Sequence, residues 1–428
     1  MRVLIVNTSE RTGGAAVAAN RLMKALNNNG VKAKMLVRDK EDDSLTVVAL
    51  PPSPLLRWHF LWERFVVFCR LRFSRKHLFE VDIANSGSDI TKLREFQEAD
   101  VIHLHWINQG MLSLNGIRQI LRSGKPVVWT MHDIWPATAI CHVTLGCRNF
   151  TTQCRECRLL PGQGSKNDFS TSVWLKKQRM LEDGNIYYVA CSRWLESEAK
   201  KSALLKGQKV TSVPNPIDTH IYKKGDKQEA RSRLGLPLDK KLILFASQRV
   251  TNENKGMSYL IEACQQLQDI PNLGVVILGG HAEEFTSQLS ARPEGTLSSE
   301  RTFPLGYIND EQRIVDVYNA ADVFVLPSLS ENLPNTIMEA MACGVPCVGF
   351  KVGGIPEEID HKKNGYVAVY RDANDLAKGI RWILTEADYD ALSENAVHKV
   401  IRNYSQQSVA MRYLDVYHQA MAFNNYRL

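Results

Sequence analysis

Residues 326–346 read LPSLSENLPNTIMEAMACGVP, and this stretch decides the interpretation of the fold. A buried strand pattern ends at Leu326, a polar loop follows, and a helical pattern runs from Thr336 to Ala342. Gly344 ends the helix, and a second strand pattern runs from Val345 to Phe350. A strand, a helix and a strand in this order predict one repeating unit of a parallel sheet covered by helices.

The same alternation extends over the rest of the chain. Further strands are expected at residues 3–6, 34–37, 101–105, 127–131, 187–191, 242–246, 275–278 and 323–326, and further helices at 18–26, 117–121, 258–267, 311–320, 376–384 and 408–421. The segment 214–218 contains two prolines and interrupts the pattern, so we expect an exposed linker there. Because 428 residues exceed one ordinary core, the sequence predicts two doubly wound α/β domains.

Composition narrows the class of protein. Hydrophobic residues make up 44% and charged residues 23%, which are values of a globular protein. The chain starts on a strand pattern, without the charged and apolar leader of a secretory signal, and it offers no run of about 20 apolar residues that could span a bilayer. We therefore expect a cytoplasmic protein whose nine cysteines are thiols or metal ligands. The net charge of +7 fits either a soluble surface or attraction to anionic lipids and phosphorylated substrates.

Four charged residues follow strands of the second half. Arg249 and Lys255 come after the strand at 242–246, Glu331 lies in the loop after Leu326, and Glu339 lies one turn inside the next helix. Two cations and a helix start can neutralise a diphosphate, and carboxylates can accept hydrogen bonds from sugar hydroxyls. For the cations alone, a solvated charged loop is the alternative.

The order of these residues resembles a known family. Glu331 and Glu339, followed by Ala-Met-Ala-Cys-Gly-Val-Pro, resemble the E-x7-E signature of retaining family 4 glycosyltransferases of GT-B fold. The spacing from Arg249 to Lys255-Gly256 is similar to that family as well. Further matching segments are Gly13-Gly14, Gly306-Tyr307, Leu104-His105-Trp106 and Trp129-Thr-Met-His-Asp133-Ile-Trp135, of which the last two look closest to transferases of the colanic acid type.

The resemblance implies a fold. Two Rossmann-like domains would face each other across a cleft. Residues 1–216 would form the acceptor-side domain, to which 405–428 return, and residues 217–404 would bind the nucleotide sugar.

The resemblance also implies site residues. Arg249 and Lys255 would hold the donor diphosphate, Glu339 the ribose and Glu331 the transferred sugar. The remaining contacts would come from the amides of Leu333 and Asn335 to the distal phosphate, from the Gly13-Gly14 loop to the same phosphate, from the backbone near Tyr307 to the base, and from His132 to the sugar. Asn332 departs from the family, many members of which have glycine there, and this leaves the sugar open.

The implied chemistry is transfer of a sugar from a UDP- or GDP-linked donor to a glycan or lipid-linked acceptor of a surface polysaccharide, without a metal cofactor. Asp388-Tyr389-Asp390, the one D-x-D segment, reads as a solvated helix edge. A sugar-nucleotide epimerase of the same fold and a non-catalytic, membrane-associated nucleotide-sugar-binding protein are the alternatives. A nicotinamide dehydrogenase is disfavoured because the first turn lacks G-x-G-x-x-G.

Histidines of the first half have more than one interpretation. His103 and His105 lie on one face of their strand, which suits a metal pair, structural packing or acceptor contact. Since no third ligand is evident, packing or acceptor contact is favoured. His132 would be a satisfied polar residue at a strand end if it does not touch the sugar.

Cysteines cluster between residues 141 and 157. Cys141, Cys147, Cys154 and Cys157 have the spacing C-x5-C-x6-C-x2-C, which predicts a structural zinc site. Four unlinked thiols in a surface loop are the alternative.

The segment 55–73 interleaves aromatic residues with arginines. Residues 51–80 contain six Lys or Arg against two Glu. This composition is compatible with contact with a membrane surface, in which case the protein would be peripheral on the inner face of the plasma membrane. A core helix with a basic outer face is the alternative. Nucleic-acid binding is not expected, because no recognised module surrounds the segment.

Overall fold

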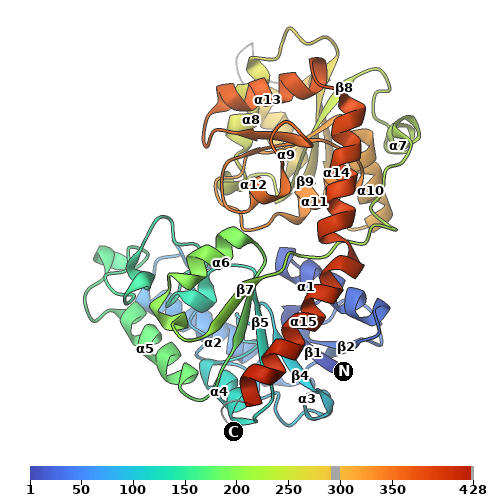
Figure 1. The fold of residues 1–428 in the computed structure, drawn as a ribbon. Coiled ribbons are helices and arrows are strands. Elements are labelled where there is room, and N and C mark those ends of the chain that lie inside the picture. The colour runs from blue at the N-terminus through green and yellow to red at the C-terminus, as the bar shows by residue number, and fades with distance from the viewer. Residues whose placement is uncertain (291–298, 426–428) are drawn as a thin grey trace. The chain divides into compact units, whose positions relative to one another are not determined.

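The computed structural model describes residues 1–290 and 299–425 and divides the chain into two compact units. The first unit comprises Met1–Pro216 with Val409–Leu428, and the second comprises Ile217–Ser408. Each contains one parallel sheet with helices packed on it (Figure 1). The predicted fold class, two doubly wound α/β domains, is confirmed.

The first unit is built on a seven-stranded sheet in the order β3-β2-β1-β4-β5-β6-β7. All its paired strands are parallel. The strands are β1 (Arg2–Ser9), β2 (Lys32–Asp39), β3 (Val47–Ala49), β4 (Val101–Leu104), β5 (Val127–Met131), β6 (Tyr187–Ala190) and β7 (Lys209–Ser212). The helices are α1 (Gly14–Asn28), α2 (Pro54–Arg70), α3 (Arg94–Glu98), α4 (Leu114–Arg122), α5 (Phe169–Leu181) and α6 (Arg193–Lys200).

The second unit is built on a six-stranded sheet in the order β10-β9-β8-β11-β12-β13, also parallel throughout. The strands are β8 (Lys241–Arg249), β9 (Leu273–Gly280), β10 (Thr302–Gly306), β11 (Val323–Leu326), β12 (Cys347–Phe350) and β13 (Gly365–Ala368). The helices are α7 (Lys227–Leu234), α8 (Met257–Gln265), α9 (Ala282–Ser290), α10 (Glu311–Ala320), α11 (Asn335–Ala342), α12 (Ile355–Glu358), α13 (Ala373–Thr385) and α14 (Tyr389–Tyr404). Asp388 caps α14, and Asp388 and Asp390 are exposed, as predicted for a solvated helix edge.

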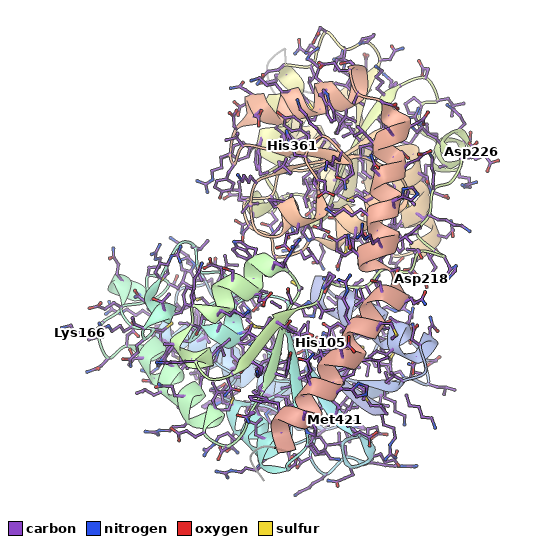
Figure 2. All side chains as sticks on the ribbon, viewed as in Figure 1. His105, Lys166, Asp218, Asp226, His361 and Met421 are labelled. Carbon is purple, nitrogen blue, oxygen red and sulfur yellow. The ribbon has the colours of Figure 1, made fainter. Side chains whose placement is uncertain are left out.

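The last helix, α15 (Gln406–Asn425), packs on the core of the first unit. Its stripe of Val409, Tyr413, Val416, Tyr417 and Ala420 is buried, as the spacing predicts. Met421 of the same helix, labelled in Figure 2, also packs against that core. The chain therefore completes its N-terminal unit only with its last segment.

Two expectations about segments are corrected. The segment 214–218 is not an exposed linker, because Asn215, Pro216 and Ile217 are buried. The Ile217 N–H donates to the Tyr404 carbonyl at 2.8 Å, and the Ile217 carbonyl accepts from the Gln406 N–H at 3.1 Å. These bonds connect the segment to the end of α14. They satisfy buried backbone groups in a segment that its two prolines keep out of regular secondary structure.

The helix α2 corrects one of the two alternatives for segment 55–73. An ordinary core helix would turn its aromatic residues inward, yet Trp58, Trp62 and Phe65 are exposed. Its buried residues are Glu63, Arg64 and Val67. The helix packs on the unit with its inner side, but its outer side is aromatic and not only basic, so the core-helix alternative is wrong for the outer side.

Candidate active site

The candidate site of the second unit lies where its parallel strands end. Arg249 is the last residue of β8, and its side chain is exposed. Tyr307 follows β10 and is 66% exposed, and Glu331 follows β11. The strands β10, β9, β8 and β11 are consecutive in a parallel sheet. These three residues therefore lie on the same side of the sheet, at the carboxyl ends of its strands.

Lys255 and Glu331 form an ion pair at this edge. The Lys255 Nζ lies 2.5 Å from the Glu331 Oε1, and their side chains are 30% and 12% exposed. The two residues are 76 positions apart in the chain, so folding brings them together. A half-buried cation and a half-buried carboxylate thus neutralise each other where a charged ligand can reach them.

The backbone around Lys255 is docked against the loop that leads to Glu331. The Leu329 N–H donates to the Asn254 carbonyl at 2.8 Å. A Cβ at Gly256 would lie 1.8 Å from the Pro327 carbonyl oxygen, so the close approach requires glycine. This contact sets the position of Lys255 relative to β11.

Glu331 is supported from the neighbouring strand as well. Gly353 follows β12 and has a φ of 56°, and a Cβ there would lie 1.6 Å from the Glu331 carbonyl oxygen. The backbone of Glu331 is therefore held between the loops that follow β8 and β12.

The start of α11 lies just beyond Glu331. Its N-cap is Pro334, and within the described residues no side chain caps this helix start. Leu333 is buried and Asn335 is half-buried. The first N–H groups of an α-helix have no partner inside the helix, so this end suits the binding of a phosphate.

Glu339 lies inside α11 and is 8% exposed. Its Oε2 accepts a hydrogen bond of 2.7 Å from the hydroxyl of Tyr318 on α10. Burial and the neighbouring Glu339 raise the pKa of Tyr318 well above its ordinary value, so the tyrosine remains a donor. The contact orients the carboxylate that the resemblance assigns to the ribose.

Sequence reasoning missed Glu358, a third carboxyl group near Glu331 and Glu339. Glu358 is fully buried at the end of α12, and neither carboxyl oxygen has a hydrogen-bond partner among the described residues. Burial first, and then the negative charge of Glu331, raise the pKa of Glu358 well above its ordinary value. The signal in the sequence is the helical spacing of Ile355, Glu358 and Ile359, which puts the carboxyl group on the apolar face.

In the first unit, His132 follows β5 and belongs to a row of three imidazoles. The His132 Nε2 lies 2.9 Å from the Nδ1 of His105, which is labelled in Figure 2. His103 bonds the hydroxyls of Tyr417 and Thr130 at 2.9 and 2.8 Å, which confirms the packing interpretation for this residue. Burial lowers the pKa of His132 to about 4 and that of His103 to about 3, so both are neutral at pH 7.

The residue after His132 begins a network of charges that is half-buried at Asp133 and His142 and buried at Asp82 and Arg64. The Asp133 Oδ2 lies 2.8 Å from the His142 Nδ1, and the His142 Nε2 lies 2.6 Å from the Asp82 Oδ2. Asp82 in turn pairs with Arg64 of α2. Burial opposes a charge on His142, but the Asp133 and Asp82 carboxylates outweigh it and raise the pKa of His142 to about 10.

Gly13 and Gly14 stand at the start of α1, beyond the end of β1. Gly13 is the N-cap of the helix, and no side chain among the described residues caps it. The role of this helix start at the distal phosphate stays a prediction.

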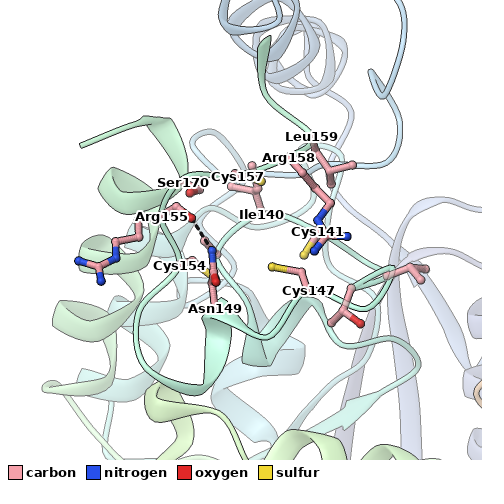
Figure 3. Close-up of a pocket in the computed structure, with 13 residues that line it drawn as sticks. Ile140, Cys141, Cys147, Asn149, Cys154, Arg155, Cys157, Arg158, Leu159 and Ser170 are labelled. Atoms are coloured by element: carbon pink, nitrogen blue, oxygen red, sulfur yellow. Dashed lines mark hydrogen bonds between the residues drawn. The ribbon is translucent and has the colours of Figure 1, made fainter. Parts of the chain in front are cut away.

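The four cysteines of the 141–157 cluster line one small pocket (Figure 3). Burial raises the pKa of Cys141 to about 11 and that of Cys154 to about 12. Among the described residues, no three His, Cys, Asp or Glu side chains are arranged so that they could hold a metal ion. The zinc site stays a prediction, and it requires the four sulfur atoms to move closer together.

Comparison with known proteins adds two family models. Residues 12–221 match the model described as Glycosyltransferase Family 4. Residues 226–399 match the model described as Glycosyl transferases group 1. Together the two matches cover most of both units.

Individual proteins are similar at lower identity. An uncharacterized glycosyltransferase of Methanocaldococcus jannaschii is 31% identical over 46% of this chain and 49% of its own length, so the chain spans about half of that relative. The alpha-maltose-1-phosphate synthase of Mycolicibacterium smegmatis is 26% identical over 78% of this chain and 83% of its own length. The structure of Anabaena HepE in complex with UDP-glucose has a TM-score of 0.62 at 16% identity, covering 98% of this chain and 100% of that chain.

Proposed function

We propose that this chain is a retaining enzyme of polysaccharide assembly. Glycosyltransferase models match both of its halves, and the chain therefore belongs to the glycosyltransferases of GT-B fold. It transfers a sugar from a nucleoside diphosphate to a growing, lipid-linked surface glycan. Residues 217–404 bind the donor, and residues 1–216 with 405–428 serve the acceptor.

The Lys255–Glu331 ion pair is the observation that carries this proposal. A diphosphate that reaches Lys255 competes with the carboxylate for the ammonium group. Glu331, once released, can accept a hydrogen bond from a hydroxyl of the sugar attached to that diphosphate. One exchange of partners thus binds both parts of the donor, and it explains why a carboxylate lies beside a phosphate site.

The neighbouring residues complete the donor site. Arg249 and the N–H groups at the start of α11, near Leu333 and Asn335, share the diphosphate charge with Lys255. Glu339, oriented by Tyr318, accepts from the ribose hydroxyls. The backbone near the exposed Tyr307 faces the base.

Groups of the first unit have a separate part in the proposal. The neutral imidazole of His132 can donate or accept a hydrogen bond at a sugar hydroxyl. The start of α1 at Gly13-Gly14 lies after β1, and its backbone approaches the distal phosphate.

In the transfer step, the acceptor hydroxyl oxygen forms a bond to the anomeric carbon as the bond from that carbon to the phosphate oxygen breaks. The electron pair leaves with the diphosphate, and the hydroxyl proton passes to a phosphate oxygen. Attack from the face that the diphosphate leaves retains the configuration. Cations and helix N–H groups take up the leaving charge, so the step needs no divalent metal ion.

The nucleotide and acceptor are finer parts of the proposal. The complex of HepE with UDP-glucose favours uridine as the base, with guanosine as the other candidate. The relative in M. smegmatis is named as a synthase of a sugar phosphate, which supports transfer chemistry in a protein similar over most of its length.

The test is acceptor-dependent release of nucleoside diphosphate, followed with UDP- and GDP-linked sugars. Lys255→Ala and Glu331→Ala should each lower the rate by about 100-fold or more, since each removes charge stabilisation at the reacting group. Lys378→Ala and Glu262→Gln, which change exposed residues of the same unit, are the controls. Activity should persist in EDTA, and NMR should show a product of retained configuration.

Each alternative has its own outcome. Epimerised sugar nucleotide without diphosphate release identifies the epimerase. Binding of a nucleotide sugar without any turnover identifies the non-catalytic protein. Full activity in both Ala variants contradicts the assigned site.

A further inference from the structure

The helix α2 (Pro54–Arg70), labelled in Figure 1, differs from an ordinary amphipathic helix in which side chains it exposes. Its buried side chains include the charged Glu63 and Arg64. Five of its large apolar side chains are exposed, among them Trp58 and Phe65 at 61% and 56%, whereas Leu56, Phe60 and Phe68 are half-buried. A helix that packs on a core normally shows the reverse arrangement.

The exposed apolar residues form one continuous stripe. They are Leu55, Trp58, Leu61, Trp62 and Phe65. At about 100° per residue, they fall within an arc of about 120°, opposite the side that carries Glu63, Arg64 and Val67. Such a stripe is the pattern of a helix with an apolar partner on its outer side, and the described part of the chain does not provide one.

Buried polar contacts hold the inner face of α2 in place. The Glu63 Oε1 accepts the N–H groups of Ile83 and Ala84 at 2.8 and 2.7 Å. The Arg64 guanidinium donates to the Leu78 carbonyl at 2.6 Å and pairs with Asp82. These contacts determine which side of the helix faces outward.

The same contacts connect α2 to the loop that carries His132. Asp82, which pairs with Arg64, lies 2.6 Å from His142, and His142 lies 2.8 Å from Asp133. Asp133 directly follows His132 in the chain. The outward apolar face therefore has a defined position relative to a residue that we assign to the sugar.

The surroundings of the stripe are basic. The exposed cations are Arg57, Arg70, Arg72, Arg75 and Lys76. Within residues 51–80, all of which the structure describes, Glu80 is the one exposed carboxylate. Phe73 and Phe79 add exposed aromatic surface beside these cations, at 70% and 63%. A surface that is apolar in the middle and positive around it complements the interface of an anionic bilayer.

We propose that α2 and the basic segment to Lys76 are a docking surface for a membrane of anionic phospholipid. The helix lies in the plane of the interface, with Trp58, Trp62 and Phe65 among the headgroups and upper acyl chains. The docking is peripheral, and no helix among the described residues has the length and apolarity to cross the bilayer. This inference rests on the proposed function and deepens it. Docking through α2 would bring the His132 loop to the surface where a lipid-linked acceptor is found.

The experiment is flotation of the full-length protein with vesicles, in the absence of donor and acceptor. Vesicles of phosphatidylglycerol mixed with phosphatidylcholine should bind the protein, and vesicles of phosphatidylcholine alone should bind it more weakly. Raising the salt concentration should weaken binding to the anionic vesicles. The variant Trp58→Ser/Trp62→Ser/Phe65→Ser should lower the partition coefficient by about 100-fold or more, because each aromatic residue contributes burial of apolar area.

The matched control is Leu238→Ser/Ile401→Ser, which removes two apolar residues of the second unit that are 50% and 52% exposed. This control should bind the vesicles as the wild type does. Equal binding by the triple variant, or no binding of the wild type to anionic vesicles, overturns the proposal. Wild-type self-association in sedimentation velocity that the triple variant loses would assign the surface to a second copy instead. Transfer to a soluble acceptor is measured separately, so failure of docking and failure of the proposed function are distinguishable.

Discussion

Glu358→Gln is predicted to change how the stability of the second unit depends on pH. In the folded chain the carboxyl group is fully buried without a partner among the described residues, and its pKa is raised well above 4.5 by burial and then by Glu331. In the unfolded chain it ionises near its ordinary value. Above that value the unfolded state has lost this proton while the folded state retains it.

The sign and size of the effect follow from this difference. A folded pKa above the unfolded one contributes stability below pH 4.5, and that contribution is lost as the pH rises towards the folded pKa. Between the unfolded and the folded pKa of this group, the free energy of unfolding therefore falls by about 1.4 kcal/mol per pH unit. The amide that Glu358→Gln introduces does not titrate, so the variant lacks this slope.

Calorimetry at pH 5.5, 6.5 and 7.5 measures the melting temperature of each unit in wild type and variant. As the pH rises, the melting temperature of the second unit should fall more steeply in the wild type than in the variant, by about 3–6 °C for each pH unit below the folded pKa of Glu358. Glu262→Gln, an exposed change in the same unit, should leave the wild-type dependence intact. Parallel curves for wild type and Glu358→Gln would refute the reasoning, since they would mean that the buried carboxyl group does not retain its proton.

Further predictions concern both units. His142→Gln should lower the free energy of unfolding by about 2 kcal/mol at pH 7, because it leaves the half-buried Asp133 without its cation and the buried Asp82 with Arg64 alone. With a folded pKa of about 10, that stability is present below pH 6.5 and lost through pH 10, and a pH-independent difference in calorimetry would contradict this. Tyr318→Phe should raise the Kd for the nucleotide sugar about tenfold, because Glu339 loses the hydroxyl that orients it. Tyr187→Phe in the first unit should leave the Kd unchanged. An equal Kd for both variants contradicts the orienting role of Tyr318. Purified protein should contain about one zinc ion per chain by mass spectrometry, and Cys157→Ser should lose it; a stable, zinc-free wild type contradicts the zinc prediction.

The central strands of both sheets could be predicted from the sequence, and the edge strands could not. Strands such as β8 and β11 are covered on both faces, so they appear as uninterrupted apolar runs. The strands without a prediction, β3, β7, β10 and β13, lie at the four edges of the two sheets. Most of their residues are only half-buried, and their apolar pattern is correspondingly weak.

For the candidate site, the sequence predicted residue types but not their partners. The spacing of Glu331 and Glu339 indicated a donor site, whereas the ion pair with Lys255 depends on contact across 76 positions. The composition of α2 showed aromatic residues and arginines without showing which side is buried. That depends on Glu63 and Arg64, which find their partners between residues 78 and 84.

The most direct test of the central claim is calorimetric titration of nucleoside diphosphates and their sugars into wild type, Lys255→Ala, Glu331→Gln and the exposed control Lys378→Ala. Wild type and control should bind one diphosphate type, and Lys255→Ala should bind it about 100-fold more weakly. Glu331→Gln should still bind the diphosphate, because Lys255 no longer has an internal partner. This variant should not bind the nucleotide sugar more tightly than the free diphosphate. Binding to Lys255→Ala at wild-type affinity would contradict the account.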